Sequence, residues 1–537
     1  MTKPKVYVIG VGMTKFVKPR SIPNWDYPDM VKEAVTKALV DAKLQYKDIE
    51  QAVVSYLYGG TCCGQRALYE IGLTGIPIFN VNNACASGSS GVYLCKQILE
   101  SGNADVVMAV GFEKMAPGSL EAMQGNMDER AQPVEKHIEV MAETYGLFPA
   151  PITAQMFANA GKEHMEKYGT KREHFAKIAY KNHLHSVNNP NSQFQKAYTL
   201  EEVLNARKIY DFMGLLECSP TSDGAAAAVL CSERYLLQHP ELRPQAVEIL
   251  GIEVGTDMPS VFAERSNIKM IGFDMIRKIS ADLYRRTGIN PEDVQVIELH
   301  DCFAPNELIT YEALGLCPIG KGGEIVDRRD NTYGGKWVIN PSGGLISKGH
   351  PIGATGVAQV VELSTQLRGL AGRRQVPNCM VAVQHNIGIG GAGVVAMYRL
   401  ADGAATRATV NDVVKPSAQT RFASDVIFEE VKDRVAEEKD LVKALNSSFR
   451  ITITGGPNGG VKKWTIDCKS DPPFVGERVG DVDIEIIVSD SDFIQLASGK
   501  LKPDQAFMQG RMKLKGNVAK AMRIRSLLDP KLLKAKL

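Results

Sequence analysis

Apolar and polar residues follow two patterns along this chain, one typical of buried strands and one typical of helices that cover them. Residues 5–14 and 246–256 are β-rich runs that both end in turns containing glycine. Further along, 41–55 and 286–300 each place an acidic helix-start signal before a short apolar strand. The same sequence of elements is therefore predicted twice.

The repetition continues in the segments that follow. Residues 83–94 and 350–363 each open with small residues and continue as a helix, and 104–113 and 378–395 then each supply an apolar strand. Such alternation predicts a duplicated α/β unit that extends to about residue 400, with each half a sheet covered by helices.

These patterns divide the chain into parts with different composition. The two halves are predicted at 1–245 and 246–402, and a segment rich in Met, Gln, Asn and His at about 115–206 is expected to be a helical insertion in the first half. Small and polar residues at 403–423 predict a linker. An apolar helical pattern followed by alternating strands predicts a small α+β domain at 424–537.

Composition and charge exclude several classes of protein. The 537 residues are 44% apolar and 23% charged, as in ordinary globular proteins, and 63 basic against 61 acidic residues leave a net charge of +2. Bulk charge therefore does not favour nucleic acid. We expect no secretory signal, because no basic segment followed by an apolar run opens the chain, and no membrane span, because polar residues and glycines interrupt the most apolar window, 379–398. Ten cysteines without paired spacing indicate reduced thiols in an intracellular compartment and make structural zinc unexpected.

One cysteine lies where a reactive thiol is expected. Cys85 is in the small-residue segment 83–91, after a predicted strand and before a predicted helix. Unpaired backbone N–H groups and the helix dipole favour a thiolate there, and small neighbours admit a substrate. Taken alone, the motif fits a buried structural cysteine equally well.

Two further motifs carry titratable groups. His350 lies in the glycine-rich segment 340–356, where a sharply bent backbone can bring the imidazole near a partner. His300 and Cys302 lie in segment 300–307, directly after an apolar strand, and the carboxyl ends of strands are where α/β sheets present their sites.

Other histidines lack such a setting. His164, His183 and His185 have no companion set of metal ligands, which favours solvated or capping roles.

Together these motifs resemble those of the thiolase family. Residues 1 to about 400 resemble a thiolase, and the HDCF, GHPIGATG and HNIGIGG motifs resemble the branch fused to a sterol-carrier-type domain. Residues 425–537, especially 507–517, resemble that carrier domain. The resemblance implies a layered α-β-α-β-α thiolase fold followed by a lipid-binding α+β domain.

The resemblance also implies roles for the motif residues. Cys85 matches the nucleophile that accepts the acyl group, and His350 matches the histidine that activates it. His300 would help to bind the thioester oxygen, and Cys302 could shuttle a proton. Backbone N–H groups of Cys85 and of Gly388 or Gly390 would stabilise the oxyanion.

One departure from the general thiolase pattern makes Cys302 more important. Most thiolases carry an acid/base cysteine in a late Cys-x-Gly motif, but residues 384–391 here contain none. Cys302 is the most economical replacement, because an enolate leaving group needs a proton donor. In the same segment, His385 would orient substrate, tune Cys85 or satisfy local hydrogen bonds.

The implied activity is thiolysis of 3-oxoacyl-CoA by ping-pong transfer through an acyl-Cys85 intermediate. The resemblance suggests 2-methyl-branched and bile-acid-intermediate substrates of peroxisomal β-oxidation, with propanoyl-CoA or acetyl-CoA released. Coenzyme A would be a co-substrate, and no metal or other cofactor is expected. Two alternatives are a condensing enzyme built on Cys85, His350 and His385, and a lipid-transfer protein with a non-catalytic thiolase scaffold.

Location and partners follow from the same resemblance. Ala535, Lys536 and Leu537 resemble a peroxisomal address. They predict recognition by the peroxisomal import receptor and a place in the peroxisome matrix, alongside a cytoplasmic pool. We further expect a homodimer through the thiolase part, and a lipid or sterol in the carrier domain.

Overall fold

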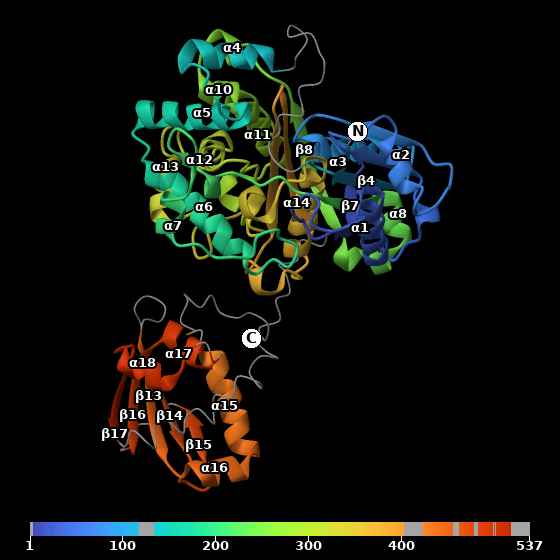
Figure 1. The fold of residues 1–537 in the computed structure, drawn as a ribbon. Coiled ribbons are helices and arrows are strands. Elements are labelled where there is room, and N and C mark those ends of the chain that lie inside the picture. Colours follow the sequence, from blue (N-terminus) through green and yellow to red (C-terminus); the bar gives the residue numbers. More distant parts are fainter. Residues whose placement is uncertain are drawn as a thin grey trace. The chain divides into compact units, whose positions relative to one another are not determined.

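The chain forms two compact units, Met1–Val413 and Val414–Leu537, and the division lies inside the predicted linker 403–423 (Figure 1). The computed structural model describes residues 4–116, 134–401, 424–454, 461–476, 482–497 and 501–516, together with 422 and 499. The tripeptide at 535–537 lies outside the described residues, so its role as an address stays a prediction.

Ten strands form one sheet in the first unit, in the order β10-β9-β11-β12-β8-β1-β7-β4-β2-β3. Their bounds are β1 Val6–Met13, β2 Gln51–Ser55, β3 Ile78–Val81, β4 Val106–Glu113, β7 Gly224–Ser232, β8 Val247–Gly255, β9 Val296–Glu298, β10 Val338–Ile339, β11 Val381–Gly388 and β12 Ala392–Leu400. Five neighbouring strands come from each half of the chain. Antiparallel pairing of β1 with β8, through Tyr7–Glu248 and Val8–Val247, joins the two halves.

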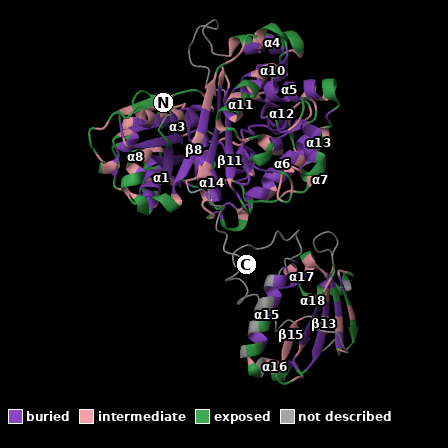
Figure 2. Cartoon of the chain, turned by 180° about the vertical axis from the view of Figure 1, so that it is seen from behind, coloured by how far each residue is buried: buried purple, intermediate pink, exposed green. Residues whose placement is uncertain are grey.

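Helices lie in three layers around these strands, which confirms the predicted layered fold. On one outer side, α1 (Tyr27–Ala42) packs on β1 and β7, and on the other α11 (Phe273–Thr287) packs on β8 and β12. Between the halves, α3 (Ser87–Glu100) and α14 (Ile352–Leu367) pack on each other and on strands of both halves. Nearly all of α14 is therefore buried (Figure 2).

Helices α4 to α7 form the insertion, which is helical as predicted; within it α5 and α6 pack on α12, and α6 also packs on α13 (Figure 1). The bounds are α4 Glu135–Thr144, α5 Ile152–Tyr168, α6 Arg172–Ser186, α7 Leu200–Leu204, α12 Ala304–Ala313 and α13 Gly322–Arg328. Shorter elements of this unit are α2 Cys63–Leu68, β5 Lys208–Tyr210, β6 Met213–Gly214, α8 Glu233–Gln238, α9 Ser260–Ala263, α10 Asn267–Met270 and a π-helical turn at Gly344–Lys348.

The prediction of solvated or capping histidines in the insertion was wrong. His164, His183 and His185 are buried, and both ring nitrogens of each are hydrogen-bonded. Apart from Thr170, which bonds His164 Nδ1, their partners come from segments far away in sequence, such as Glu312 for His164 at 2.9 Å. Buried polar groups paired in this way leave no pattern in the local sequence.

The prediction of a single strand at 378–395 was also wrong. The segment contains all of β11 and the start of β12, which form an antiparallel hairpin. Gly390 and Gly391, with φ of 102° and 98°, reverse the chain in a conformation that residues with a Cβ rarely adopt. Because β11 and β12 are both largely apolar, residues 378–395 have the sequence pattern of one long strand.

A five-stranded sheet in the order β15-β14-β13-β16-β17 forms the second unit, which confirms the predicted α+β class. The bounds are α15 Asp425–Glu437, α16 Lys439–Leu445, β13 Ser448–Thr454, β14 Lys462–Asp467, β15 Phe474–Gly476, β16 Ile484–Ser489, α17 Asp490–Ala497, α18 Pro503–Met508 and β17 Met512–Gly516. In its core, the ring of Phe428 stacks on Trp464 and on Phe493, with centroids 4.6 and 4.9 Å apart. Over the described residues of both units, none of the helices has the length and apolar character needed to cross a bilayer.

Candidate active site

Cys85 lies in a strained turn between β3 and α3. The preceding residue, Ala84, has a φ of 48°, in a region that costs a non-glycine residue roughly 1 kcal/mol or more. Ser87 holds the turn, because its Oγ accepts the N–H of Asn83 at 2.8 Å and donates to the carbonyl of Ala84 at 2.6 Å. Cys85 stays partly exposed while the helix behind it is buried.

Three residues from separate motifs converge at this turn. The Sγ of Cys85 and one ring nitrogen each of His300 and His350 all lie within 4.8 Å of one another. The two imidazole rings meet edge to face, with centroids 5.2 Å apart. Such compactness also suits a metal ion, but an ion bound through Sγ would occupy the nucleophile. The geometry equally places two bases beside one thiol.

The proton on neutral His350 can be located from its partners. The Thr355 hydroxyl donates to the carbonyl of Pro351 at 3.1 Å, so its oxygen accepts from His350 Nδ1 at 2.6 Å. Nε2 then carries no proton, and it has no hydrogen-bond partner among the described residues. Burial, His300 and Lys348 lower the pKa of His350 well below its usual value. The resting imidazole is therefore a neutral proton acceptor.

In the resting protein, burial outweighs the backbone N–H just before α3 that lowers the pKa of Cys85, as the sequence predicted. Burial, and next the carboxylate of Glu113, raise the pKa of Cys85 to about 12. Glu113 is itself buried and accepts N–H groups of Leu57, Tyr58 and Gly353 at 3.0, 3.0 and 2.9 Å. Burial raises its own pKa to about 7. Cys85 is therefore a thiol that needs a base.

The second predicted cysteine is a buried thiol. Burial, and next the neighbouring Cys85, raise the pKa of Cys302 far above its usual value. A neutral thiol is the form that can donate a proton.

His385 is a residue of β11 and lies beside His300, which follows β9. Its Nδ1 accepts the backbone N–H of His300 at 3.3 Å, so in the neutral ring Nε2 carries the proton. That Nε2 has no hydrogen-bond partner among the described residues. His385 is not part of the Cys85, His300 and His350 group.

The two candidate oxyanion glycines have different surroundings. A Cβ on Gly388 would lie 2.1 Å from the carbonyl oxygen of Asn83 and 3.2 Å from the nitrogen of Ala86, so only glycine fits against the Cys85 turn. Gly390 is exposed in the β11–β12 hairpin. Both border a pocket lined by His137 and Asp257 and by the apolar residues Met156, Met270, Ile271, Met275, Ile387 and Ile389.

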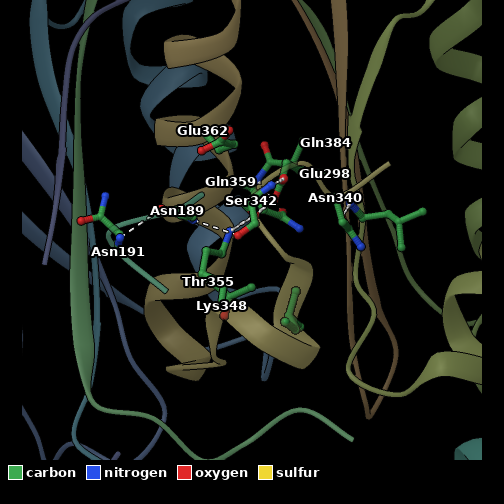
Figure 3. A network of polar contacts seen from close by, with 12 residues as sticks. Asn189, Asn191, Glu298, Asn340, Ser342, Lys348, Thr355, Gln359, Glu362 and Gln384 are labelled. Carbon is green, nitrogen blue, oxygen red and sulfur yellow. Dashed lines mark hydrogen bonds and ion pairs between the residues drawn. The ribbon is translucent and has the colours of Figure 1, made fainter. Parts of the chain in front are cut away.

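Two buried polar clusters behind the site were not predicted. In one, Lys348 Nζ lies 3.2 Å from Glu298 Oε2 and 2.8 Å from Ser342 Oγ, beneath the turn that leads to His350 (Figure 3). The other joins Gln359 of α14 to Gln384 and neighbouring residues of β11 (Figure 3). The polar residues 384–386 inside an apolar strand were a visible signal of the second cluster. The first left none, since Glu298 lies 44 residues before Ser342 in the sequence.

Family models match both units of the chain. The model described as "Thiolase, N-terminal domain" matches residues 6–234, and "Thiolase C-terminal domain-like" matches 262–397. The model of the "SCP-2 sterol transfer family" matches 428–529.

Curated relatives match over nearly the whole length. "Sterol carrier protein 2" of Bos taurus is 53% identical over 97% of this chain and 96% of its own, and that of Homo sapiens is 50% identical over 98% and 97%. "Non-specific lipid-transfer protein-like 2" of Caenorhabditis elegans is 76% identical over 74% of this chain and 97% of its own.

Among solved structures, human mitochondrial 3-ketoacyl-CoA thiolase superposes on 74% of this chain and 99% of its own, with a TM-score of 0.54 and 18% identity, which supports the fold alone. From the matches over both units, we conclude that the chain belongs to the thiolase family of acyltransferases and carries a C-terminal domain of the SCP-2 sterol transfer family.

Proposed function

We propose that the first unit thiolytically cleaves 3-oxoacyl-CoA, with 2-methyl-branched and bile-acid-intermediate acyl groups as preferred substrates. The products would be a shortened acyl-CoA and propanoyl-CoA or acetyl-CoA. The observation that carries this proposal is the convergence of Cys85 Sγ with ring nitrogens of His300 and His350 within 4.8 Å, beside the buried thiol of Cys302.

In the first half-reaction, His350 takes the proton of the Cys85 thiol, and the thiolate attacks the C3 carbonyl carbon. Backbone N–H groups of Cys85 and of a hairpin glycine stabilise the oxyanion, and the close packing of Gly388 on the Cys85 turn favours it over Gly390. The bond between C2 and C3 then breaks, its electron pair forms an enolate, and Cys302 donates a proton to C2.

In the second half-reaction, coenzyme A loses its thiol proton to the Cys302 thiolate and attacks the acyl group on Cys85. Cys85 leaves as a thiolate and recovers its proton from His350, so each group returns to its starting state. Proton and acyl transfers account for the whole cycle, with coenzyme A as co-substrate. Ping-pong kinetics follow, because the first product leaves before coenzyme A reacts.

Replacement of Cys302 tests this assignment against the condensing alternative, and turnover by the unmodified protein tests the scaffold alternative. We expect Cys302→Ala to lower thiolysis by roughly 10²- to 10⁴-fold, the usual contribution of a general acid, while acyl-CoA still acylates Cys85. A spectrophotometric assay of 3-oxoacyl-CoA loss and mass spectrometry of the Cys85 adduct measure the two effects. Full thiolysis by the variant would reject the role of Cys302. No turnover by the unmodified protein would favour the scaffold alternative.

The proposed preference for branched chains comes from the family resemblance, and three methionines border the pocket beside Gly388. Met156, Met270 and Met275 contribute flexible, polarisable side chains that adapt to irregular apolar groups. We expect a higher kcat/KM for a 2-methyl-branched 3-oxoacyl-CoA than for the straight chain of equal length. Equal values for the matched pair would contradict this preference.

For the rest of the chain, we propose that the SCP-2 domain carries a lipid or sterol and that the first unit forms a homodimer. Relatives named sterol carrier protein 2 and the terminal Ala535-Lys536-Leu537 support import into the peroxisome matrix, where the reaction would serve β-oxidation.

A further inference from the structure

A cluster of buried amides lies where the elements that carry the active-site residues meet. Gln359 comes from α14, Gln384 and Asn386 from β11, and Ser89 from α3. All four are fully buried, and Asn386 donates to Ser89 Oγ at 2.8 Å. The cluster reaches His300 through a contact between Asn386 Oδ1 and His300 Nδ1 at 3.0 Å.

Backbone carbonyls fix which way the two glutamine amides face. Gln384 Nε2 lies 2.6 Å from the carbonyl oxygen of Gly356, and Gln359 Nε2 lies 3.3 Å from that of His385. A carbonyl oxygen only accepts, so each NH₂ group must face it. The oxygens then point elsewhere, and Gln384 Oε1 accepts the Tyr398 hydroxyl at 2.5 Å.

The direction of Asn386 follows from that of Gln359. Because Gln359 Oε1 is an acceptor, the Asn386 atom hydrogen-bonded to it is Nδ2. The other atom, Oδ1, therefore faces His300 and can only accept. Nδ1 of His300 must carry a proton, which in the neutral ring leaves Nε2 bare.

We propose that Asn386, oriented by Gln359 and Gln384, is a positioning residue that holds neutral His300 as the Nδ1–H tautomer. Nε2 of His300 is then a proton acceptor in the resting site, as Nε2 of His350 is. This inference adds a role for Asn386 to the proposed thiolysis. Only the predicted change in kcat rests on that proposed function.

The tautomer changes when His300 can bind a substrate oxygen. A bare Nε2 cannot donate to the thioester oxygen, so donation requires one more proton in the site. The Cys85 thiol supplies it on attack by way of His350, and at deacylation the proton returns through His350 to Cys85. The donor to the thioester oxygen thus forms only when the nucleophile has been activated, and protons balance over the cycle.

The tautomer can be measured without substrate. The full-length protein labelled with ¹⁵N-histidine would be examined by NMR at neutral pH, with His300→Gln used to assign the signals. We expect His300 Nε2 at the shift of a bare ring nitrogen and Nδ1 at that of a protonated one. The reverse assignment would overturn the proposal. Since no turnover is needed, this result is independent of whether thiolysis itself is found.

Replacement of Asn386 tests whether it sets the tautomer. Asn386→Leu should mix the two tautomers and lower kcat roughly 10- to 100-fold with a smaller change in KM, as loss of an outer-shell histidine partner does. Asn386→Asp keeps an acceptor at Nδ1 and should restore the tautomer and part of kcat. An unchanged His300 spectrum in Asn386→Leu would overturn the role of Asn386.

Two further variants separate this effect from a general loss of stability. Asn331→Leu removes another buried asparagine, which donates to Tyr311, and it should leave the His300 spectrum unchanged. If Asn386→Leu does not fold, Gln359→Leu removes the acceptor that orients Asn386 and should mix the tautomers. A single tautomer in folded Gln359→Leu would contradict the proposed orientation.

Discussion

At the scale of single residues, burial rather than helix-end electrostatics decides the resting state of the nucleophile. Cys85 precedes α3, yet its pKa is raised to about 12, with Glu113 as the largest charged contributor. Partial charges at a helix end contribute about 1 kcal/mol, whereas loss of water around a thiolate costs several times more. The thiol therefore has to give its proton to a base. The hydrogen bonds at Nδ1 of His350 and of His300 leave Nε2 of each ring free to accept it.

The charge of Glu113 can be tested through the reactivity of Cys85. Glu113→Gln removes the carboxylate that disfavours the thiolate, so the pKa of Cys85 should fall and alkylation by iodoacetamide should accelerate. Since the pKa of Glu113 is raised to about 7, the repulsion is present mainly above pH 7. We expect a small acceleration at pH 6 and a larger one at pH 8.

The exposed Glu70 provides the control for this measurement. It pairs with Arg66 on the surface, so Glu70→Gln should leave alkylation of Cys85 unchanged at both pH values. An acceleration by Glu113→Gln that is equal at pH 6 and pH 8 would contradict the titration of Glu113 between them.

At the scale of elements, the site depends on the close approach of α3 and α14. A Cβ on Gly356 would lie 2.3 Å from the backbone nitrogen of Ser89, and one on Gly88 would lie 2.8 Å from the carbonyl oxygen of Gly353. These contacts are with backbone atoms, which cannot move out of the way by a change of rotamer. The glycines therefore set the spacing between the helix that follows Cys85 and the helix that follows His350.

Gly356→Ala should push these helices apart. We expect a loss of at least about 2 kcal/mol in unfolding free energy of the first unit, together with a lower kcat, because overpacked interiors shift backbone. Denaturant unfolding and the thiolysis assay measure both. Gly60→Ala is the matched control, since a Cβ there meets nothing within 4 Å. Equal stability of the two variants would show that the helices separate at no cost.

The elements also show what the sequence could predict. The strands of the two halves and the helical insertion follow from alternation and helical spacing, because each buries one face. Helix α14 was placed by its small-residue start, although nearly all of it is buried and it has no polar face to mark it. The hairpin at Gly390 and the buried pairing of His164 with Glu312 depend on three-dimensional contacts that local patterns do not record.

The same distinction applies to the candidate site. The motifs of Cys85, His300 and His350 each suggested chemistry, but none of them carried the distances that join them. The orientation of Asn386 depends on carbonyls of Gly356 and His385, which no side-chain motif includes.

At the scale of the whole molecule, the two units have separate hydrophobic cores. Phe428, Trp464 and Phe493 belong to a core made only of residues of the second unit, and the other cores lie in the first. Among the described residues, each of these cores therefore draws its members from one unit. We infer that the chain unfolds in two steps and that each step belongs to one unit.

Calorimetry of the full-length chain with one core variant in each unit tests this independence. Phe428→Ala removes the ring stacked on Trp464 and Phe493 and should lower the stability of the second unit by about 3–5 kcal/mol. The transition of the first unit and thiolysis should not change. Leu242→Ala, in a buried position of the first unit, should move only the other transition. A shift of both transitions by either variant would show that the units are coupled. Lipid bound to the second unit would then also change the stability of the first.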